Sequence, residues 1–238
     1  MDNAAYAVLT RQSGLLSELR AVANNVANAE TGGFRAEGVI FSEYVAALGR
    51  DAPSLSMASA RVRETSFAEG AFAQTGGPLD LAIAGEGFFL VATLDGERLT
   101  RAGSFTQDAN GDVVNAQGHG LLDAGGAPVF IPPGTAQIGI AADGTISADG
   151  IPVGQVGLFV PADPGTMTRQ DGVLFDAGGD ILPAEGATLS QGFLEESNVD
   201  AISQITRLIA VQRAYELGQD LLDREDARIR NVIQTLSR

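Results

Sequence analysis

The 238-residue sequence lacks cysteine, lysine and tryptophan, and it contains a single histidine, His119. Without cysteine the chain can form neither disulfides nor thiolate metal sites, and it has no thiol nucleophile. Without lysine it can form no Schiff base and has no phosphate-binding lysine of a nucleotide loop. A lone histidine flanked by Gly118 and Gly120 is typical of a turn. We therefore predict no catalytic residue, no metal ligand and no cofactor.

Long hydrophobic runs are also missing. The longest apolar stretches, Gly87 to Ala92 and Ala201 to Val211, are short or interrupted by polar residues, whereas a membrane-spanning helix needs roughly 20 apolar residues. The first residues show no basic region followed by an apolar block, so we expect no cleaved signal peptide and no direct membrane insertion.

The charge is strongly negative and unevenly distributed. The net charge is −15, which opposes binding to a phosphate backbone, because that affinity comes from basic residues. Residues 1–30 sum to −1 and residues 193–238 to −2, which leaves −12 for the stretch between them. Near-neutral ends and an acidic middle indicate ends that meet other protein surfaces and a middle that faces water. Nucleic acid is not an expected partner.

The N-terminal residues predict one helix from Asp2 to about Ala29. Apolar residues recur there at spacings of three, four and seven, with Gln12 as the one polar residue on the stripe. The stripe consists of Val8, Leu15, Leu19, Val22, Val26 and Ala29. Thr31-Gly32-Gly33 would end the helix, since glycine accepts the left-handed conformation.

From about Phe67 to Gly192 the pattern is that of short strands. Apolar or alternating runs are separated by Asx-Gly pairs that suit tight hairpin turns. The expected strands are Leu79–Ala84, Phe88–Thr93, Asp112–Asn115, Val129–Ile131, Gln137–Ile140 and Val153–Val160; the expected turns are Asp95-Gly96, Asn110-Gly111, Asp143-Gly144 and Asp149-Gly150. We predict an all-β, hairpin-rich domain, preceded by a connector over Gly49 to Ser66.

Helical periodicity returns from Ser197 to Leu236, with Ser197 or Asn198 as the expected N-cap. Seven of nine heptad positions counted from Leu208 are apolar, which favours a coiled-coil-like stripe. These positions are Leu208, Val211, Tyr215, Gly218, Leu222, Glu225, Ile229, Val232 and Leu236. We predict a mainly β protein whose long terminal helices pair in a coiled-coil-like bundle.

The N-terminal helix carries an asparagine trio, Asn24, Asn25 and Asn28. Asparagine is unfavourable in a helix interior, so local propensity does not explain the trio. Asn24 and Asn28 share one face and could bond to a neighbouring chain; the alternative is that the trio only frays the helix end.

Five segments, in order along nearly the whole chain, resemble the flagellar rod and hook family. Residues Met1-Asp2-Asn3 through Ala23–Phe34 resemble the family's N-terminal signature, and Gly192–Val199 with Gln212–Glu216 resemble its C-terminal signature. Gly77–Phe89 is similar to the stretch that opens the family's β-domain, and Thr100–Phe105 with Asp108–Gly111 to the segment that follows. Thr31-Gly32-Gly33-Phe34 departs by a second glycine from the Thr-Ala-Gly-Phe or Thr-Pro-Gly-Phe that is usual in the family. The opening residues and the modest length are most similar to proximal rod members, with distal rod or hook-type members as the alternative.

This resemblance implies a structural subunit of the basal-body rod, which crosses the periplasm and transmits torque for motility. Its partners would be other copies of itself, other flagellar rod proteins and the flagellar type III export apparatus. The assembly residues would lie on the terminal helices: Leu15, Leu19, Val22, Asn24, Asn25, Val26, Asn28, Leu208, Val211, Gln212, Arg213, Tyr215, Leu222, Ile229 and Val232. Phe41 and Val45 resemble the family's export element.

The implied organisation is an N-terminal assembly helix over residues 1–33, a connector with the export element over 34–66, a β-rich domain over 67–192 and a C-terminal assembly helix over 193–238. Two readings of other classes stay open at this point. The chain could be a monomeric β-rich binding module with its helices packed on the sheet, or, with less in its favour, an acid–base hydrolase.

Overall fold

A computed structural model describes residues 2–46 and 55–236, and it describes side chains from residue 8 to 40 and from 64 to 236. The chain divides into two compact units. We call residues 1–29, 36–67 and 199–238 the terminal unit, and residues 30–35 and 68–198 the central unit.

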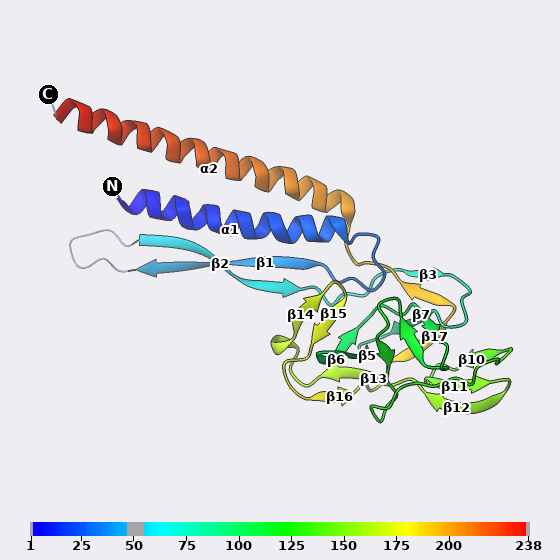
Figure 1. The fold of residues 1–238 in the computed structure, drawn as a ribbon. Helices are drawn as coiled ribbons and strands as arrows, with labels where there is room; N and C mark the ends of the chain where they lie inside the picture. Colours follow the sequence, from blue (N-terminus) through cyan, green and yellow to red (C-terminus); the bar gives the residue numbers. More distant parts are fainter. Residues whose placement is uncertain (1, 47–54, 237–238) are drawn as a thin grey trace. The chain divides into compact units, whose positions relative to one another are not determined.

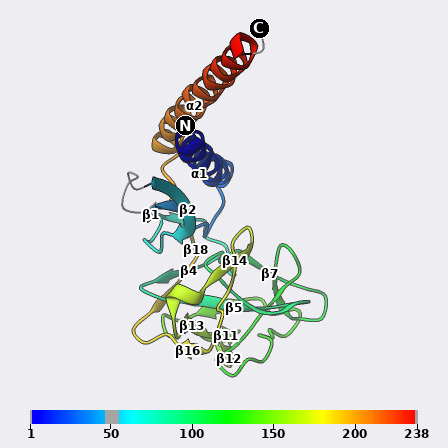
Figure 2. The same ribbon diagram turned by 90° about the vertical axis from the view of Figure 1, so that its left-hand side faces the viewer.

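The terminal unit contains two helices, α1 (Asp2–Ala27) and the longer α2 (Ala201–Leu236). They lie side by side in Figure 1 and Figure 2. The N-cap of α2 is Asp200, not Ser197 or Asn198, because the Asp200 carboxylate accepts a hydrogen bond from the Ile202 N–H at 3.2 Å. A side-chain oxygen on the second helical N–H is the usual N-cap arrangement.

The terminal unit also contains an antiparallel hairpin of β1 (Glu37–Ala46) and β2 (Leu55–Thr65), and both strands contact α1. Residues 55–65 were expected to be connector, so the reading of Gly49 to Ser66 as a connector is wrong for these residues. Their many Ser and Ala residues read as a loop, but pairing with β1 supplies the backbone partners that local propensity does not. No helix in the described part of the chain is both long and apolar enough to cross a membrane.

The central unit is built from short antiparallel strands. Their bounds are β3 Phe72–Gln74, β4 Leu81–Ala84, β5 Phe88–Thr93, β6 Gly96–Thr100, β7 Phe105–Gln107, β8 Val113–Asn115, β9 Gly120–Leu121, β10 Ile138–Ile140, β11 Thr145–Ala148, β12 Ile151–Gln155, β13 Leu158–Pro161, β14 Thr168–Asp171, β15 Leu174–Asp176, β16 Ile181–Pro183, β17 Thr188–Gln191 and β18 Phe193–Glu195. The largest sheet has the order β14-β15-β6-β5-β9-β8-β7, and β13 pairs with both β5 and β16. Smaller sheets are β10-β11-β12, β17-β4 and β18-β3.

The hairpin turns follow the predicted Asx-Gly pairs. Asp95-Gly96 joins β5 to β6, Asn110-Gly111 lies between β7 and β8, and Asp149-Gly150 joins β11 to β12. Asp149 and Gly150 have φ angles of 50° and 83°, which is the backbone that two-residue hairpins require. The expected single strand Val153–Val160 is wrong, since β12 and β13 belong to different sheets.

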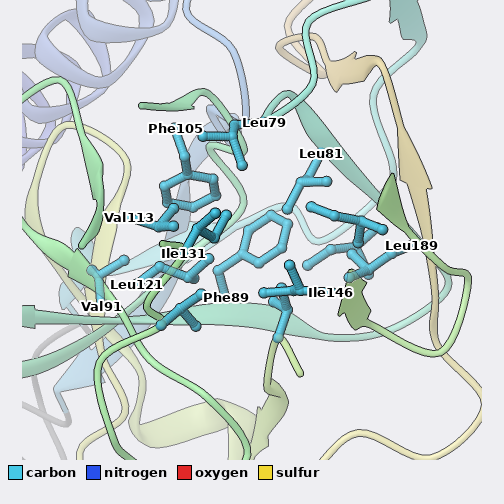
Figure 3. Close-up of a cluster of buried hydrophobic side chains, with 14 of the residues drawn as sticks. Leu79, Leu81, Phe89, Val91, Phe105, Val113, Leu121, Ile131, Ile146 and Leu189 are labelled. Carbon is cyan, nitrogen blue, oxygen red and sulfur yellow. The ribbon is translucent and has the colours of Figure 1, made fainter. Parts of the chain in front are cut away.

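Apolar side chains from many of these strands meet in one core. Figure 3 shows Phe89 among Leu81, Phe105, Ile131 and Ile146, and all five side chains are buried. The edge of the Phe105 ring faces Phe89, with ring centroids 5.3 Å apart, an arrangement that aromatic pairs favour. The prediction of a β-rich central region with a helix at each end is confirmed.

Candidate functional site

The predicted assembly residues of α1 and α2 fall into three levels of exposure. Leu15, Val22, Asn25 and Val211 are buried; Leu19, Asn24, Val26, Asn28, Leu208, Tyr215 and Leu222 are half-buried; and Gln212, Arg213, Ile229 and Val232 are exposed. The stripe of α1 and the first half of the α2 stripe are therefore largely covered within this chain. The last two turns of α2 are not.

Polar contacts fix the direction of the two helices. Gln12 donates to the Tyr215 carbonyl at 2.8 Å, and Nε of Arg207 donates to Glu18 at 2.6 Å. Partners that lie later in α1 lie earlier in α2, so the helices run antiparallel.

The asparagine trio has partners within the chain. Asn25 is 1% exposed; its amide donates to the Glu37 carbonyl at 2.7 Å and accepts from the Glu37 N–H at 2.8 Å. Asn25 thus bonds to the backbone of Glu37, at the start of β1, as a residue of a neighbouring strand would. Asn28 donates to the carbonyl and to the side chain of Asn24 at 2.8 and 3.0 Å, so these two residues bond to each other.

Other apolar side chains of the helices are exposed. On α1, Leu9 and Leu16 are seven residues apart and on one face. The exposed apolar residues of α2 are Ile202, Ile205, Ile209, Leu217, Leu221, Ile229, Val232, Ile233 and Leu236. Leu236 is 83% exposed. Among them Val232 and Leu236 follow Ile229 at spacings of three and four, so these three side chains lie on one face of α2. Single exposed leucines are common, whereas several on one face are not.

Phe41 and Val45, the predicted export element, lie in β1. Their side chains fall outside the described residues.

In the central unit the structure places a buried ionic cluster that sequence reasoning missed. The Glu195 carboxylate lies 2.6 Å from Nη1 of Arg35 and 3.2 Å from Nη1 of Arg101, and all three side chains are buried. It also accepts the Gly70 N–H at 2.8 Å. Burial is the main cause that lowers the pKa of Arg101; Glu195 raises this pKa and Arg35 lowers it further.

Segments that resemble the family signatures meet at this cluster. Gly33 donates its N–H to the Glu195 carbonyl at 2.8 Å, and a Cβ at Gly33 would lie 2.7 Å from Cα of Ala102. Arg169 lies over the rings of Phe34 and Phe175, at 4.4 and 4.6 Å from their centroids. The cluster therefore ties residues 33–35, where the chain enters the central unit, to Glu195, close to where it leaves.

Charge differs sharply between the units. The central unit contains 18 Asp and Glu residues against four Arg, a net charge of −14, whereas the terminal unit contains 12 against 11, a net charge of −1. No three or more Asp, Glu or His side chains in the described ranges are grouped so that they could hold a metal ion.

Comparisons with known proteins agree with these features. Residues 82–148 match the family described as the flagellar hook protein FlgE/F/G D1 domain, and residues 190–235 match the flagellar basal body rod FlgEFG protein C-terminal family. The chain belongs to the flagellar basal-body rod proteins, a class of structural subunits.

Within that class the FlgF proteins are the favoured group. The chain is 38% identical to the flagellar basal-body rod protein FlgF of Mesorhizobium japonicum, over 99% of this chain and 98% of that protein. The chain is 37% identical to FlgF of Caulobacter vibrioides, over 100% of this chain and 99% of that protein. It is 30% identical to FlgG of the same organism, over 97% of this chain and 99% of that protein. The proximal rod interpretation is thus favoured over the distal rod and over the monomeric binding module. These relatives are structural rod proteins of the basal body, not enzymes.

Proposed function

We propose that this chain polymerises through α1 and α2, which form coiled-coil-like contacts with other copies and with other rod proteins. The observation that carries the proposal is the exposed apolar face at the end of α2, in a pair of helices of almost no net charge. Ile229 and Val232 continue the apolar stripe of α2, and they are 48% and 47% exposed. A neighbouring helix at these positions would remove both side chains from water.

The charge distribution favours the same arrangement. Acidic units held within about 8 Å of each other repel one another at physiological salt, so stacked subunits gain if the central units lie outside and the near-neutral helices lie inside. The chain would then act mechanically, as part of a stiff shaft that crosses the periplasm and passes torque. It would have no catalytic activity.

We also propose that the chain leaves the cytoplasm through the flagellar export apparatus, and that Phe41 and Val45 take part. Deletion of 41–45 would remove half of β1, so substitution is the sharper test. Phe41→Ser with Val45→Ser should abolish secretion and leave the central unit folded, whereas Ser42→Ala should be secreted normally. Normal secretion of the double variant would remove the export role and leave the rod proposal intact.

The polymer proposal is tested by complementing a host strain in which the gene is deleted. The parent chain should restore rods and motility. Ile229→Asp should not, because burying an unpaired carboxylate between helices is strongly unfavourable. Leu94 is a matched control, since it is a fully exposed leucine in the β5–β6 turn of the central unit; Leu94→Asp should restore motility. Complete flagella with Ile229→Asp would refute assembly through α2.

A further inference from the structure

Two residues look like defects in the helix pair when each is considered alone. Gln12 is the polar residue on the apolar stripe of α1. Gly218 lies in the middle of α2 at a heptad position, where glycine is less favourable than alanine. Neither residue helps its own helix.

In the structure the two residues meet. Gln12 is 7% exposed, and a Cβ built at Gly218 would lie 2.8 Å from its Cδ. The missing side chain of Gly218 is therefore the space in which the Gln12 amide lies. There Nε2 of Gln12 donates to the Tyr215 carbonyl at 2.8 Å, while its Oε1 is buried with no hydrogen-bond partner among the described residues.

We propose that Gln12 and Gly218 form a pin that sets the register of the antiparallel α1–α2 pair. Heptad repeats alone specify register weakly, because a shift of one heptad brings apolar positions back opposite one another. Counting outward from the Gln12–Gly218 contact places Leu15 opposite Tyr215, Leu19 opposite Val211 and Val22 opposite Leu208.

A shift of one heptad in either direction breaks this match. In one direction the Gln12 amide would face Val211, whose β-branched side chain fills the space that Gly218 leaves open. In the other direction Leu19 would face Gly218 and leave a gap in the packing, and Gln12 would face Glu225. Only the observed register places the amide in the space beside Gly218.

The buried Oε1 without a partner is consistent with this role. A buried polar atom without a partner lowers stability, and polar groups on coiled-coil seams are best attested as determinants of register at that cost. An apolar side chain at residue 12 would fit beside Gly218 and stabilise the pair, but it would also tolerate the shifted registers.

The register has a consequence for the end of α2. Since α2 has 36 residues and α1 has 26, the pin determines how much of α2 extends past Asp2. Figure 1 shows that α2 continues beyond the N-terminal end of α1. The pin thereby decides that Ile229, Val232 and Leu236 lack a partner on α1.

The test is a distance measurement by electron spin resonance on the full-length chain. Because the sequence has no cysteine, Ala23→Cys and Ala227→Cys carry the only two spin labels, and both alanines are exposed. The parent should give one narrow distance. Gln12→Leu and Gly218→Ala should each add a second population displaced by about 10 Å, the length of one heptad.

Ser13→Leu is the matched control, because Ser13 is exposed and adjacent to Gln12 but off the stripe. It should keep the parent distance. A broad distribution in the parent chain, or a single narrow distance in both Gln12→Leu and Gly218→Ala, would overturn the pin.

Discussion

Glu195 and Arg35 form an ion pair of 2.6 Å whose side chains are 0% and 1% exposed. In the sequence, Arg35 lies where the chain enters the central unit, and Glu195 lies near where the chain leaves it. Arg101 is the third member, so two cations share one carboxylate. Nε and Nη2 of Arg35 and Nε of Arg101 are buried without a hydrogen-bond partner among the described residues. The stability of the cluster therefore depends heavily on Glu195.

Glu195→Gln should strongly destabilise the central unit. The amide can still accept the Gly70 N–H, but Arg35 and Arg101 lose the one carboxylate that both contact. Removing one member of a buried ionic group costs about 3–5 kcal/mol. The free energy of unfolding in urea measures this loss. The neighbouring Glu196→Gln, outside the cluster, should change it by less than about 0.5 kcal/mol; equal effects of the two variants would contradict the account.

The two adjacent glycines 32 and 33 should respond differently to alanine. Gly33 has a φ of 70° and no room for a Cβ beside Ala102, so Gly33→Ala should prevent folding or cost several kcal/mol. A Cβ at Gly32 would meet the Glu195 carbonyl oxygen at 3.4 Å, an ordinary contact. Gly32→Ala, which introduces one of the family's two usual residues, should keep or slightly raise the melting temperature. A larger loss of stability for Gly32→Ala than for Gly33→Ala would contradict this account of the turn.

Fragment boundaries offer another test of the same cluster. A fragment of residues 67–192 lacks Arg35, Glu195 and β18, and it leaves Arg101 without the Glu195 carboxylate. A fragment of residues 30–198 keeps all of them. The longer fragment should unfold cooperatively and with a free energy higher by roughly 3–5 kcal/mol. Equal stability in urea would mean that the cluster contributes nothing.

The stability of the first turn of α2 should depend on pH through the Asp200 carboxylate. Its hydrogen bond from Ser203 is the main cause that lowers the pKa of Asp200 from its ordinary value of 3.8, helped by the Ile202 and Ser203 N–H groups. Because the folded pKa is the lower one, the stabilisation is complete above pH 3.8 and is lost as the pH falls through the folded pKa. The amide resonance of Ile202 should report this titration below pH 3.8. Asp200→Asn keeps a good N-cap and should abolish it; a titration that persists in this variant would assign it elsewhere.

The parts of the fold that could be predicted from the sequence depend mostly on local sequence features. The α1 and α2 stripes and the Asx-Gly turns were predictable because helix periodicity and turn chemistry act over a few residues. Residues 55–65 were missed because the partner strand, rather than their own composition, makes them β2.

The missed parts of the candidate site are contacts between residues far apart in the sequence. Nothing near Arg35, Arg101 or Glu195 indicates that they share one buried cluster. Gln12 and Gly218 could each be recognised as an exception to its helix pattern, but only the fold shows that one exception accommodates the other. Asn25 was predicted as an assembly contact, and the fold adds that its side chain bonds to the backbone of Glu37 at the start of β1.

The central claim is that the exposed apolar side chains of the helices, such as Leu16 on α1 and Ile229 and Val232 on α2, become buried when the rod assembles. Single cysteines at Leu16, Val232 and Leu94 allow the rate of maleimide labelling to be compared between the purified chain and isolated basal bodies. We expect Leu16→Cys and Val232→Cys to react at least about tenfold more slowly in basal bodies, as apolar positions covered by a neighbouring helix should, and Leu94→Cys to react equally in both. Undiminished labelling of Leu16→Cys and Val232→Cys in assembled basal bodies would contradict the account.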